Sequence, residues 1–550
     1  MGYVAPRHAG WLIVLVVLVW FCNLEYRTLI KPDEGRYAEI PREMVVSGDW
    51  TTPRLNELKY FEKPPLQYWA TAAAYTLFGE HQWTSRLWTA LTGFAGIALV
   101  CFAGTRLFGR ETSWYASLLL GSSLLYVMMG HINTLDMGVT FFITLGIVGL
   151  LLGQTATHAT DQRNGMWLAW LGMGLAVLSK GLMGIILPGT ALLIYAAIHR
   201  DFGVLKRMHW LSGLLIFFAI TAPWFYAVMK ANPEFFERFF IYEHYTRFTT
   251  KDLGRYQPWH YFIPILLVGA LPWTLLMFDS LARSWRIQSN YSSAGKPFHA
   301  ARFLMIWVVF IYVFFSISGS KLPSYLLPMF PALALLMGKR LTEMRAKTLL
   351  WQVLPLIPLP LLFMAVAFNV GDYADTLLQK NLYPHYTPWL VVGAATLLVG
   401  LLSAVWLLIE DRKPTAVLVL ALSALLFSQI SLTGYETVAQ ERSAKHVANA
   451  IRAQVPPNVP FYSVLTYEQT LPFYLKRTFT LVAYQDEMAY GIKQEPQRWV
   501  ATLADLHQVW QKQPVAFAIM PHRAYPMLQQ LDMPMTIIYQ DTQHIVVKKP

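Results

Sequence analysis

Acidic and basic side chains are concentrated in one short segment near the N-terminal end of the sequence. This segment, Lys31-Pro-Asp33-Glu-Gly-Arg36, directly follows an apolar run. Carboxylates beside a bilayer are energetically costly unless they are paired, hydrated or used in chemistry. An Asp before an amphipathic helix is also a common N-cap, so Asp33 has a structural as well as a catalytic interpretation. We interpret the segment as the catalytic edge of a membrane enzyme.

Two further segments supply groups of the same kind. Glu62 and Lys63 precede a pair of prolines, which stiffens the backbone that presents them. Asp136 lies in a short turn between two apolar runs. The alternative interpretations are an exposed ion pair for the first segment and a first-turn residue that favours a helix N-terminus for the second. Asp136 would nevertheless be a second acid on the same membrane face as Asp33.

Single cations and one histidine occur at the other turns of that face. Lys180, Arg247 and Lys321 are such cations, and Tyr325 follows Lys321 closely. An isolated lysine at a membrane edge usually snorkels to water, but several cations that converge on one face indicate a phosphate site. His244 and Glu62 could ligate a divalent metal; an interfacial histidine is the alternative, because two ligands are few.

The elements that must position these groups are membrane helices. The chain has 550 residues, of which 55% are hydrophobic and only 14% are charged. A soluble protein would carry more charge. Apolar runs of roughly 17 to 25 residues recur along most of the chain, which is the length that a helix needs to cross a bilayer. The composition therefore predicts a polytopic membrane protein.

The distribution of Lys and Arg predicts the number and direction of the spans. One apolar run, 166–198, is interrupted by Ser179-Lys180-Gly181. If this run forms a hairpin, basic residues gather in the loops on the side of the N-terminus, which is the positive-inside pattern and makes the N-terminus cytoplasmic. About thirteen transmembrane helices are then expected, at 9–29, 82–105, 112–130, 135–153, 166–179, 182–198, 209–229, 258–280, 303–318, 322–338, 349–369, 386–409 and 415–433.

The C-terminal region differs from the rest of the chain. From 434 to 550, helical patterns alternate with short β-rich runs that prolines separate, which predicts a small soluble α/β domain. The membrane domain, 1–433, contributes two long outer loops at 31–81 and 230–257. We therefore expect an all-α polytopic membrane domain followed by a soluble α/β domain, which lies on the extracytoplasmic side with the outer loops.

The sequence argues against several function classes. It contains no Walker A loop, no G-x-G-x-x-G at a strand end, no G-x-S-x-G and no H-E-x-x-H. We therefore expect no nucleotide cofactor, and an extracytoplasmic enzyme then needs an activated donor such as a lipid-linked phosphate sugar. The net charge of +12 comes without a basic helix that carries interleaved aromatics, so membrane lipid is the expected partner and nucleic acid is not.

These features resemble the GT-C membrane glycosyltransferases, which have an acidic first outer loop, a second acid between spans three and four, and a distal soluble domain. More closely, Lys31-Pro-Asp33-Glu-Gly-Arg36-Tyr-Ala-Glu-Ile and Tyr60-Phe-Glu62-Lys63-Pro are similar to the 4-amino-4-deoxy-L-arabinose lipid A transferases. Glu243-His-Tyr-Thr-Arg247-Phe and Lys321-Leu-Pro-Ser-Tyr325 also match that family. Related polyprenyl-phosphate-sugar transferases share part of the pattern, including the first-loop acids.

The resemblance implies an enzyme of the bacterial inner membrane whose active site and C-terminal domain are periplasmic. It implies transfer of aminoarabinose from undecaprenyl phosphate to a lipid A phosphate, which lowers negative surface charge and confers polymyxin resistance. A divalent ion at Glu62 and His244 is compatible with the family but is not required by the sequence. The expected roles are catalysis for Asp33 and Asp136, donor phosphate binding for Lys63, Arg36, Arg247 and Lys180, and acceptor binding for Tyr60, Lys321 and Tyr325.

Two other functions remain open. A protein O-glycosyltransferase with the same class of donor would use Asp33 as general base toward a hydroxyl acceptor. A lipid A phosphate is already largely ionised, so Asp33 would instead orient the acceptor or hold the ammonium group of the sugar. A transporter or flippase for lipid-linked sugars would need functional groups at the membrane midplane and inverted repeats, and this sequence shows no such repeat.

Overall fold

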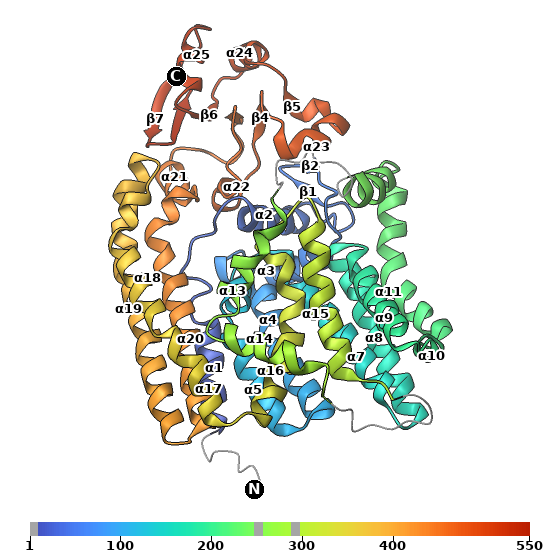
Figure 1. The fold of residues 1–550 in the computed structure, drawn as a ribbon. Coiled ribbons are helices and arrows are strands. Elements are labelled where there is room, and N and C mark those ends of the chain that lie inside the picture. Colours follow the sequence, from blue (N-terminus) through green and yellow to red (C-terminus); the bar gives the residue numbers. More distant parts are fainter. Residues whose placement is uncertain (1–8, 247–256, 288–296) are drawn as a thin grey trace.

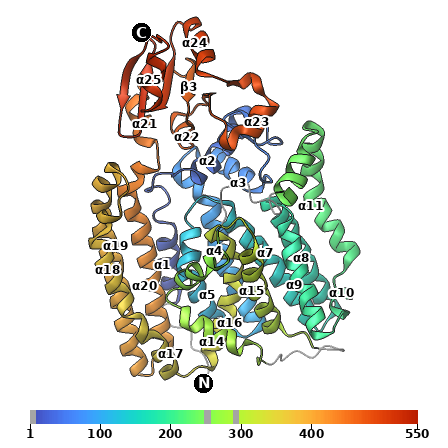
Figure 2. The ribbon, with the colours of Figure 1, turned by 45° about the horizontal axis from the view of Figure 1, so that its top comes forward.

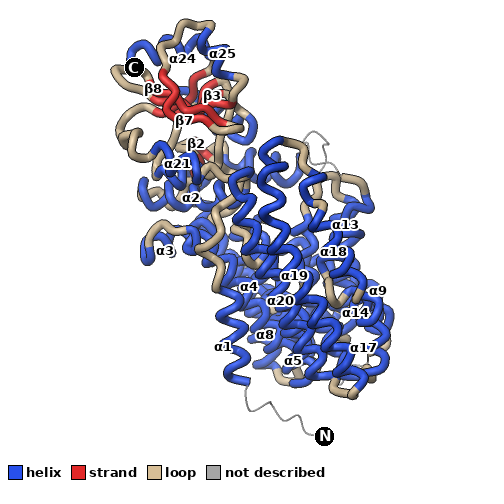
Figure 3. Tube along the Cα trace, turned by 90° about the vertical axis from the view of Figure 1, so that its left-hand side faces the viewer, coloured by secondary structure: helices blue, strands red, loops and turns tan. Residues whose placement is uncertain are grey.

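Long helices form most of the molecule, and a smaller domain with a β-sheet lies at one end of them (Figure 1). The computed structural model describes residues 9–246, 257–287 and 297–550, except for the side chains of Ala9 and of 244–246. The start of helix α1 (Ala9–Phe21) lies at the end of the helical domain that is opposite to the C-terminal domain (Figures 1 and 2). The strands gather at the C-terminal end, as the colours of Figure 3 show.

Each predicted span coincides with helical structure. Among the described residues, seven helices are long and apolar enough to cross a membrane, and the pair Trp259–Gly269 and Thr274–Ser284, bent by 111°, makes an eighth if it counts as one span. The total of thirteen spans stays a prediction. The main helices are α1 (Ala9–Phe21), α4 (Gln82–Leu107), α5 (Arg110–Ser122), α6 (Leu124–Met129), α7 (Leu135–Thr155), α8 (Ala159–Lys180), α9 (Met183–His199), α10 (Gly203–Lys206), α11 (Trp210–Ala231), α13 (Phe262–Gly269), α14 (Thr274–Ser284), α15 (Ala300–Ile317), α16 (Phe330–Glu343), α17 (Ala346–Val353), α18 (Pro358–Phe368), α19 (Leu377–Ile409) and α20 (Lys413–Gly434).

The run 166–198 forms two helices and not one long helix. Helix α8 ends at Lys180, and Gly181 has a φ of +89°, a conformation that residues with a Cβ rarely adopt. Helix α9 then lies beside α8 (Figure 2). A Cβ at Gly184 would lie 2.5 Å from the backbone nitrogen of Val177, so the two helices meet closely. The turn leaves Lys180 at the end of a helix, facing the outer loops.

The first outer loop is largely structured. It contains α2 (Asp33–Ser47), a hairpin of β1 (Arg54–Leu55) and β2 (Leu58–Lys59), and α3 (Leu66–Phe78). The apolar face of α2 is buried, as its amphipathic pattern predicts, and all of its charged side chains except Asp33 are buried as well. Most of these charges are paired, as where the Nε of Arg42 donates to Glu39 at 2.7 Å, and Glu43 accepts the backbone N–H of Glu57 at 2.7 Å. This helix is therefore enclosed by protein on its polar side too.

The C-terminal domain is a mixed six-stranded sheet with helices on both faces. The strand order is β5-β4-β3-β6-β8-β7, in which β8 and β7 are antiparallel to their neighbours. Alternate side chains of β3 pack on opposite faces, with Phe461 against α21 and α22 and Tyr462 against α24 and α25. The bounds are β3 (Phe461–Val464), β4 (Thr480–Val482), β5 (Trp499–Val500), β6 (Phe517–Pro521), β7 (Thr536–Gln540), β8 (His544–Lys548), α21 (Lys445–Ile451), α22 (Leu471–Leu475), α23 (Ala489–Gln494), α24 (Leu503–Lys512) and α25 (Ala524–Gln529).

The C-terminal domain packs directly on the first outer loop. A Cβ at Gly35 would lie 2.7 Å from the backbone of Gln469, so only glycine allows α2 to approach the domain this closely. Ile40 and Met44 of α2 share an apolar cluster with Leu481 of the domain. The domain therefore covers the loop that carries the predicted catalytic residues.

Candidate active site

A buried carboxylate fixes the segment that carries Asp33. Glu34 accepts hydrogen bonds from Nε and Nη2 of Arg86 at 2.7 and 2.8 Å, and from the backbone N–H of Asn133 at 3.0 Å. Burial alone would raise the pKa of Glu34, but the Arg86 guanidinium outweighs burial and holds that pKa below its usual value. Arg86 lies on α4 and Asn133 precedes α7, so the Glu34 side chain links the start of α2 to the start of α7. These two helix starts carry Asp33 and Asp136.

The predicted residues meet at a cavity of about 370 Å³ beneath the first outer loop. Its polar wall has charged or hydroxyl groups from six segments of the chain. Its other wall is apolar and is formed by α7, α9 and α15. Of the eleven residues that the sequence predicts, seven line this cavity: Asp33, Arg36, Glu62, Lys63, Asp136, Lys180 and Tyr325.

Asp136 and Lys180 form an ion pair inside the cavity. Thr134 is the N-cap of α7, and Asp136 lies in the first helical turn, as the structural interpretation predicted. Its carboxylate accepts a short hydrogen bond from the Nζ of Lys180 at the end of α8. That Nζ lies 5.0 Å from the ring centre of Tyr325, within the range of a cation–π contact. The two helix ends thus present one positive and one negative group to the cavity.

Asp33 and Arg36 lie together in the first turn of α2. Pro32 holds the N-cap position, so Asp33 is a first-turn residue and its side chain keeps 40% of its surface exposed. Its Oδ1 lies 3.8 Å from Nη1 of Arg36. Nη2 of Arg36 binds Glu487 of the C-terminal domain at 2.7 Å. Burial raises the pKa of Glu487, although Arg36 opposes that shift. The C-terminal domain therefore helps to orient a cation of the cavity.

A second group of charges surrounds Lys63. Its Nζ donates to the backbone carbonyl of Glu62 at 2.9 Å and lies 3.8 Å from Oε2 of Glu243. Glu243 also pairs with Nη2 of Arg238 at 3.1 Å. The second outer loop thus supplies a buried carboxylate, Glu243, that holds Lys63 at the cavity.

Of the other four predicted residues, two do not line the cavity and two have side chains outside the described part of the chain. Tyr60 is buried, and its ring centre lies 5.7 Å from the guanidinium carbon of Arg36. The Nζ of Lys321 donates to the carbonyls of Gln257, at 2.8 Å, and of Ser318; burial lowers the pKa of this lysine. The side chain of His244 and the whole of Arg247 lie outside the described part of the chain.

Of the metal site expected at Glu62 and His244, the structure therefore describes the side chain of Glu62 only. Glu62 lines the cavity, but it belongs to none of the groups of three or more His, Cys, Asp or Glu that the described residues bring together. The metal stays a prediction from the resemblance.

Sequence reasoning missed the apolar wall and the supporting carboxylates. Residues such as Ile143, Ile186 and Phe314 look like any other residue of a membrane helix, and no local signal marks them. Glu487 is far away in the sequence, in a domain without a recognisable motif. Glu243 belongs to the motif Glu243-His-Tyr-Thr-Arg247-Phe, in which His244 and Arg247 are the more obvious candidates for metal and phosphate binding.

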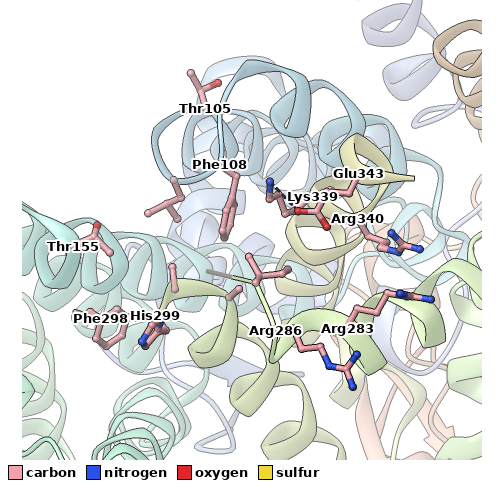
Figure 4. Close-up of a pocket in the computed structure, with 15 residues that line it drawn as sticks. Thr105, Phe108, Thr155, Arg283, Arg286, Phe298, His299, Lys339, Arg340 and Glu343 are labelled. Atoms are coloured by element: carbon pink, nitrogen blue, oxygen red, sulfur yellow. Dashed lines mark ion pairs between the residues drawn. The ribbon is translucent and has the colours of Figure 1, made fainter. Parts of the chain in front are cut away.

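A second cavity, of about 670 Å³, is lined by the C-terminal ends of α4, α14 and α16 (Figure 4), on the side of the helical domain that faces away from the C-terminal domain (Figure 1). Basic side chains of α14 and α16 line it, among them Arg283 and Arg340. Both of these arginines bind Asp279, at 2.8 and 2.7 Å. This cavity contains none of the predicted site residues.

Comparisons with known proteins identify relatives of this architecture. Residues 447–549 match the aminoarabinose transferase C-terminal domain, and residues 10–236 match the dolichyl-phosphate-mannose-protein mannosyltransferase family. Undecaprenyl phosphate-α-4-amino-4-deoxy-L-arabinose arabinosyl transferases from Edwardsiella ictaluri and Proteus mirabilis are 35% and 33% identical over 349 and 359 residues, which is 62% and 63% of this chain. The match spans only 61% and 62% of the length of these curated relatives.

A solved structure matches the whole chain. The crystal structure of ArnT from Cupriavidus metallidurans bound to undecaprenyl phosphate is 35% identical, covers 98% of both chains and has a TM-score of 0.93. The apo structure of the same protein has a TM-score of 0.92. The archaeal oligosaccharyltransferase AglB from Archaeoglobus fulgidus, at 12% identity and a TM-score of 0.50, shares the fold alone. The chain is therefore a membrane protein with the GT-C fold that belongs to the ArnT family of aminoarabinose transferases.

Proposed function

We propose that this protein transfers 4-amino-4-deoxy-L-arabinose from undecaprenyl phosphate to a phosphate of lipid A. The observation that carries the proposal is the two-sided cavity, in which acids and cations face an apolar wall of α7, α9 and α15. A polyprenyl phosphate has the same two-sided chemistry, with an anionic head and a long apolar tail. The match to ArnT bound to undecaprenyl phosphate supports this donor.

The cations of the cavity would stabilise the leaving phosphate. As the bond between the anomeric carbon and the donor phosphate breaks, negative charge grows on the phosphate oxygens, where fixed cations such as Lys180 and Lys63 stabilise it. An oxygen of the acceptor phosphate then forms the new bond to the anomeric carbon. Because this oxygen is already ionised, Asp33 serves to orient the acceptor or to hold the ammonium group of the sugar. Asp136 sets the position of the Lys180 ammonium group through their ion pair.

The cavity is placed on the periplasmic side of the bacterial inner membrane in this proposal. The cavity lies beside the first turn of α2, on which the C-terminal domain packs. The start of α1 lies at the opposite end of the molecule (Figure 1). The second cavity, which lies at the same end of the molecule as the start of α1, is lined by basic residues, as the positive-inside rule predicts for the cytoplasmic side. Lipid A that carries aminoarabinose has less negative charge, so the cell surface would bind the cationic polymyxin less tightly.

A second candidate function is the glycosylation of proteins by a polyprenyl-phosphate sugar. The match of residues 10–236 to the dolichyl-phosphate-mannose-protein mannosyltransferase family favours it. Asp33 would then be the general base that deprotonates a hydroxyl acceptor. The 40% exposure of its side chain is compatible with this role.

Mass spectrometry of lipid A tests the proposal. A strain that lacks its own transferase would express the wild type, Asp33→Asn, or the control Asp161→Asn at equal membrane levels. Asp161 is exposed and lies in the first turn of α8, at the end remote from Lys180. We expect the aminoarabinose mass increment with the wild type and the control, and a loss of at least about 100-fold with Asp33→Asn. Unmodified lipid A in the wild type, with donor present and periplasmic proteins glycosylated, would establish the protein acceptor instead.

A further inference from the structure

Two imidazoles converge on one carboxylate in the C-terminal domain. Nε2 of His446, on α21, lies 2.8 Å from Oδ2 of Asp541. Nδ1 of His544, at the start of β8, lies 3.4 Å from the same oxygen. The three ligand atoms all lie within 4.8 Å of one another. This cluster lies outside the cavity of the candidate active site, and the proposed transfer reaction does not use it.

Neighbouring groups orient the ligand atoms toward a common point. Oε1 of Glu468 lies 3.1 Å from Nε2 of His544, where it can accept the ring N–H and leave the Nδ1 lone pair facing Asp541. A histidine that ligates a metal is held by a carboxylate in this way in many metalloproteins. Oδ1 of Asp541 accepts the backbone N–H groups of Gln543 and His544, at 2.7 and 2.6 Å, which fixes the carboxylate. Oδ2 faces the two imidazoles and also accepts the Tyr539 hydroxyl at 3.0 Å.

We propose that His446, Asp541 and His544 bind a divalent transition-metal ion, for which Zn²⁺ fits best. Two imidazole nitrogens and one carboxylate oxygen form a common ligand set for zinc, with a fourth position open to water. Bonds of about 2.0–2.2 Å place the ligand atoms of a tetrahedral site roughly 3.3–3.6 Å apart. Of the observed separations, 3.4 Å lies within that range and 2.8 Å lies below it. The two imidazole nitrogens are at most 4.8 Å apart, so changes of up to about 1.5 Å in these separations form the site.

The bound ion would join α21 to β8 within the C-terminal domain, beside a contact of that domain with the first outer loop. His446 and His544 come from segments that are far apart in the sequence, and Glu468 connects the site to the Nζ of Lys31 at 3.0 Å. Lys31 precedes Asp33 by two residues and also donates its backbone N–H to Arg442 at 2.7 Å. The ion is therefore structural, and it stabilises the segment from which α2 begins.

Protons are the competing occupants of the site. Burial opposes the protonation of His544, but Asp541 and Glu468 outweigh it and raise the pKa of His544 to about 9. A doubly protonated His544 would bridge the two carboxylates without any metal. Metal binding and protonation are distinguished by counting ions, and this count does not depend on the transfer activity.

The test uses the full-length protein in detergent, stripped with a chelator, exposed to Zn²⁺ or Co²⁺ and freed of excess ion. Elemental mass spectrometry then counts metal per chain in the wild type, His446→Ala, His544→Gln and the control His522→Ala. His522 is exposed, and its Nε2 lies 2.6 Å from the backbone oxygen of Asp541 without belonging to the ligand set. The pair Glu62 and His244 is intact in all of these proteins, so the count is read as a difference.

We expect both ligand variants to lose one metal equivalent relative to the wild type, and the control to lose none. The Co²⁺ form of the wild type should also show the intense visible absorption of a tetrahedral site, which His446→Ala abolishes. If a variant fails to fold, the Co²⁺ spectrum of Glu62→Gln, which lacks a ligand of the other predicted metal site, decides the question. A wild type without tetrahedral Co²⁺, or folded variants that retain all of its metal, would overturn the proposal in favour of the protonated network.

Discussion

The Glu34→Gln substitution should destabilise the protein far more than the same change at an exposed glutamate. The side chains of Glu34 and Arg86 are 1% and 0% exposed, and the substitution leaves the Arg86 charge buried without its partner. Breaking a buried ion pair from one side costs about 3–5 kcal/mol. Arg86 keeps hydrogen bonds to the carbonyls of Leu24 and Thr28, at 2.9 and 3.0 Å, so we expect a loss near the lower limit, about 3 kcal/mol.

The matched control is Glu57→Gln. Glu57 pairs with Arg498, but the two side chains are 53% and 38% exposed, and exposed pairs contribute about 0.2–1 kcal/mol. Unfolding with SDS in mixed micelles, followed by circular dichroism, measures both losses. A double variant, Glu34→Met with Arg86→Met, should recover much of the stability because neither charge remains buried. A Glu34→Gln loss no larger than that of Glu57→Gln would refute the reasoning, because it would mean that Arg86 is hydrated.

Three other predictions follow from single side chains. Arg36→Lys should lower kcat/KM for the donor by about 10-fold or more, because a lysine cannot make the two parallel hydrogen bonds of a guanidinium group. The control Arg54→Lys changes a cation outside the cavity and should leave kcat/KM unchanged. Burial, followed by the nearby Glu39 carboxylate, raises the pKa of Glu43 from 4.5 to about 8. Between these two pH values the folded state binds a proton that the unfolded state has lost, so the unfolding temperature should fall as the pH rises from 4.5 to about 8. Glu43→Gln should make the unfolding temperature less dependent on pH in this window. Lys321→Met should lower the unfolding temperature through the lost ammonium–carbonyl contacts with an unchanged KM for lipid A; a raised KM would instead support the acceptor role predicted from the sequence.

The sequence predicts the charged half of the site because acids beside a membrane span, and a lysine that interrupts an apolar run, are uncommon. Asp33, Asp136 and Lys180 stood out for this reason, and the structure brings them to one cavity. Tyr60 and Lys321 do not line this cavity, and their acceptor role stays a prediction. Each belongs to a matching motif, but a motif does not tell whether a side chain lines the cavity or supports a residue that does.

The fold is predictable where the hydrophobic pattern is long and regular. Helices such as α7 and α20 follow directly from the apolar runs. The breaks do not: the segment predicted as one span at 112–130 divides at Ser123, whose ψ of 124° is extended. Strand β5 has only two residues, too few for an alternating pattern to predict it. The packing of the C-terminal domain on α2 depends on a close approach at Gly35, which no local pattern reveals.

The most direct test of the central claim is to locate the bound polyprenyl phosphate. A polyprenyl phosphate with a photoreactive group in the first isoprene units of its tail would be cross-linked to the full-length protein in nanodiscs, and the labelled peptides identified by mass spectrometry. We predict labelling of α7, α9 and α15 at the apolar wall around Ile143, Ile186 and Phe314, and its loss in excess undecaprenyl phosphate. Labelling that is confined to the basic cavity around Arg283 and Arg340 would contradict the account.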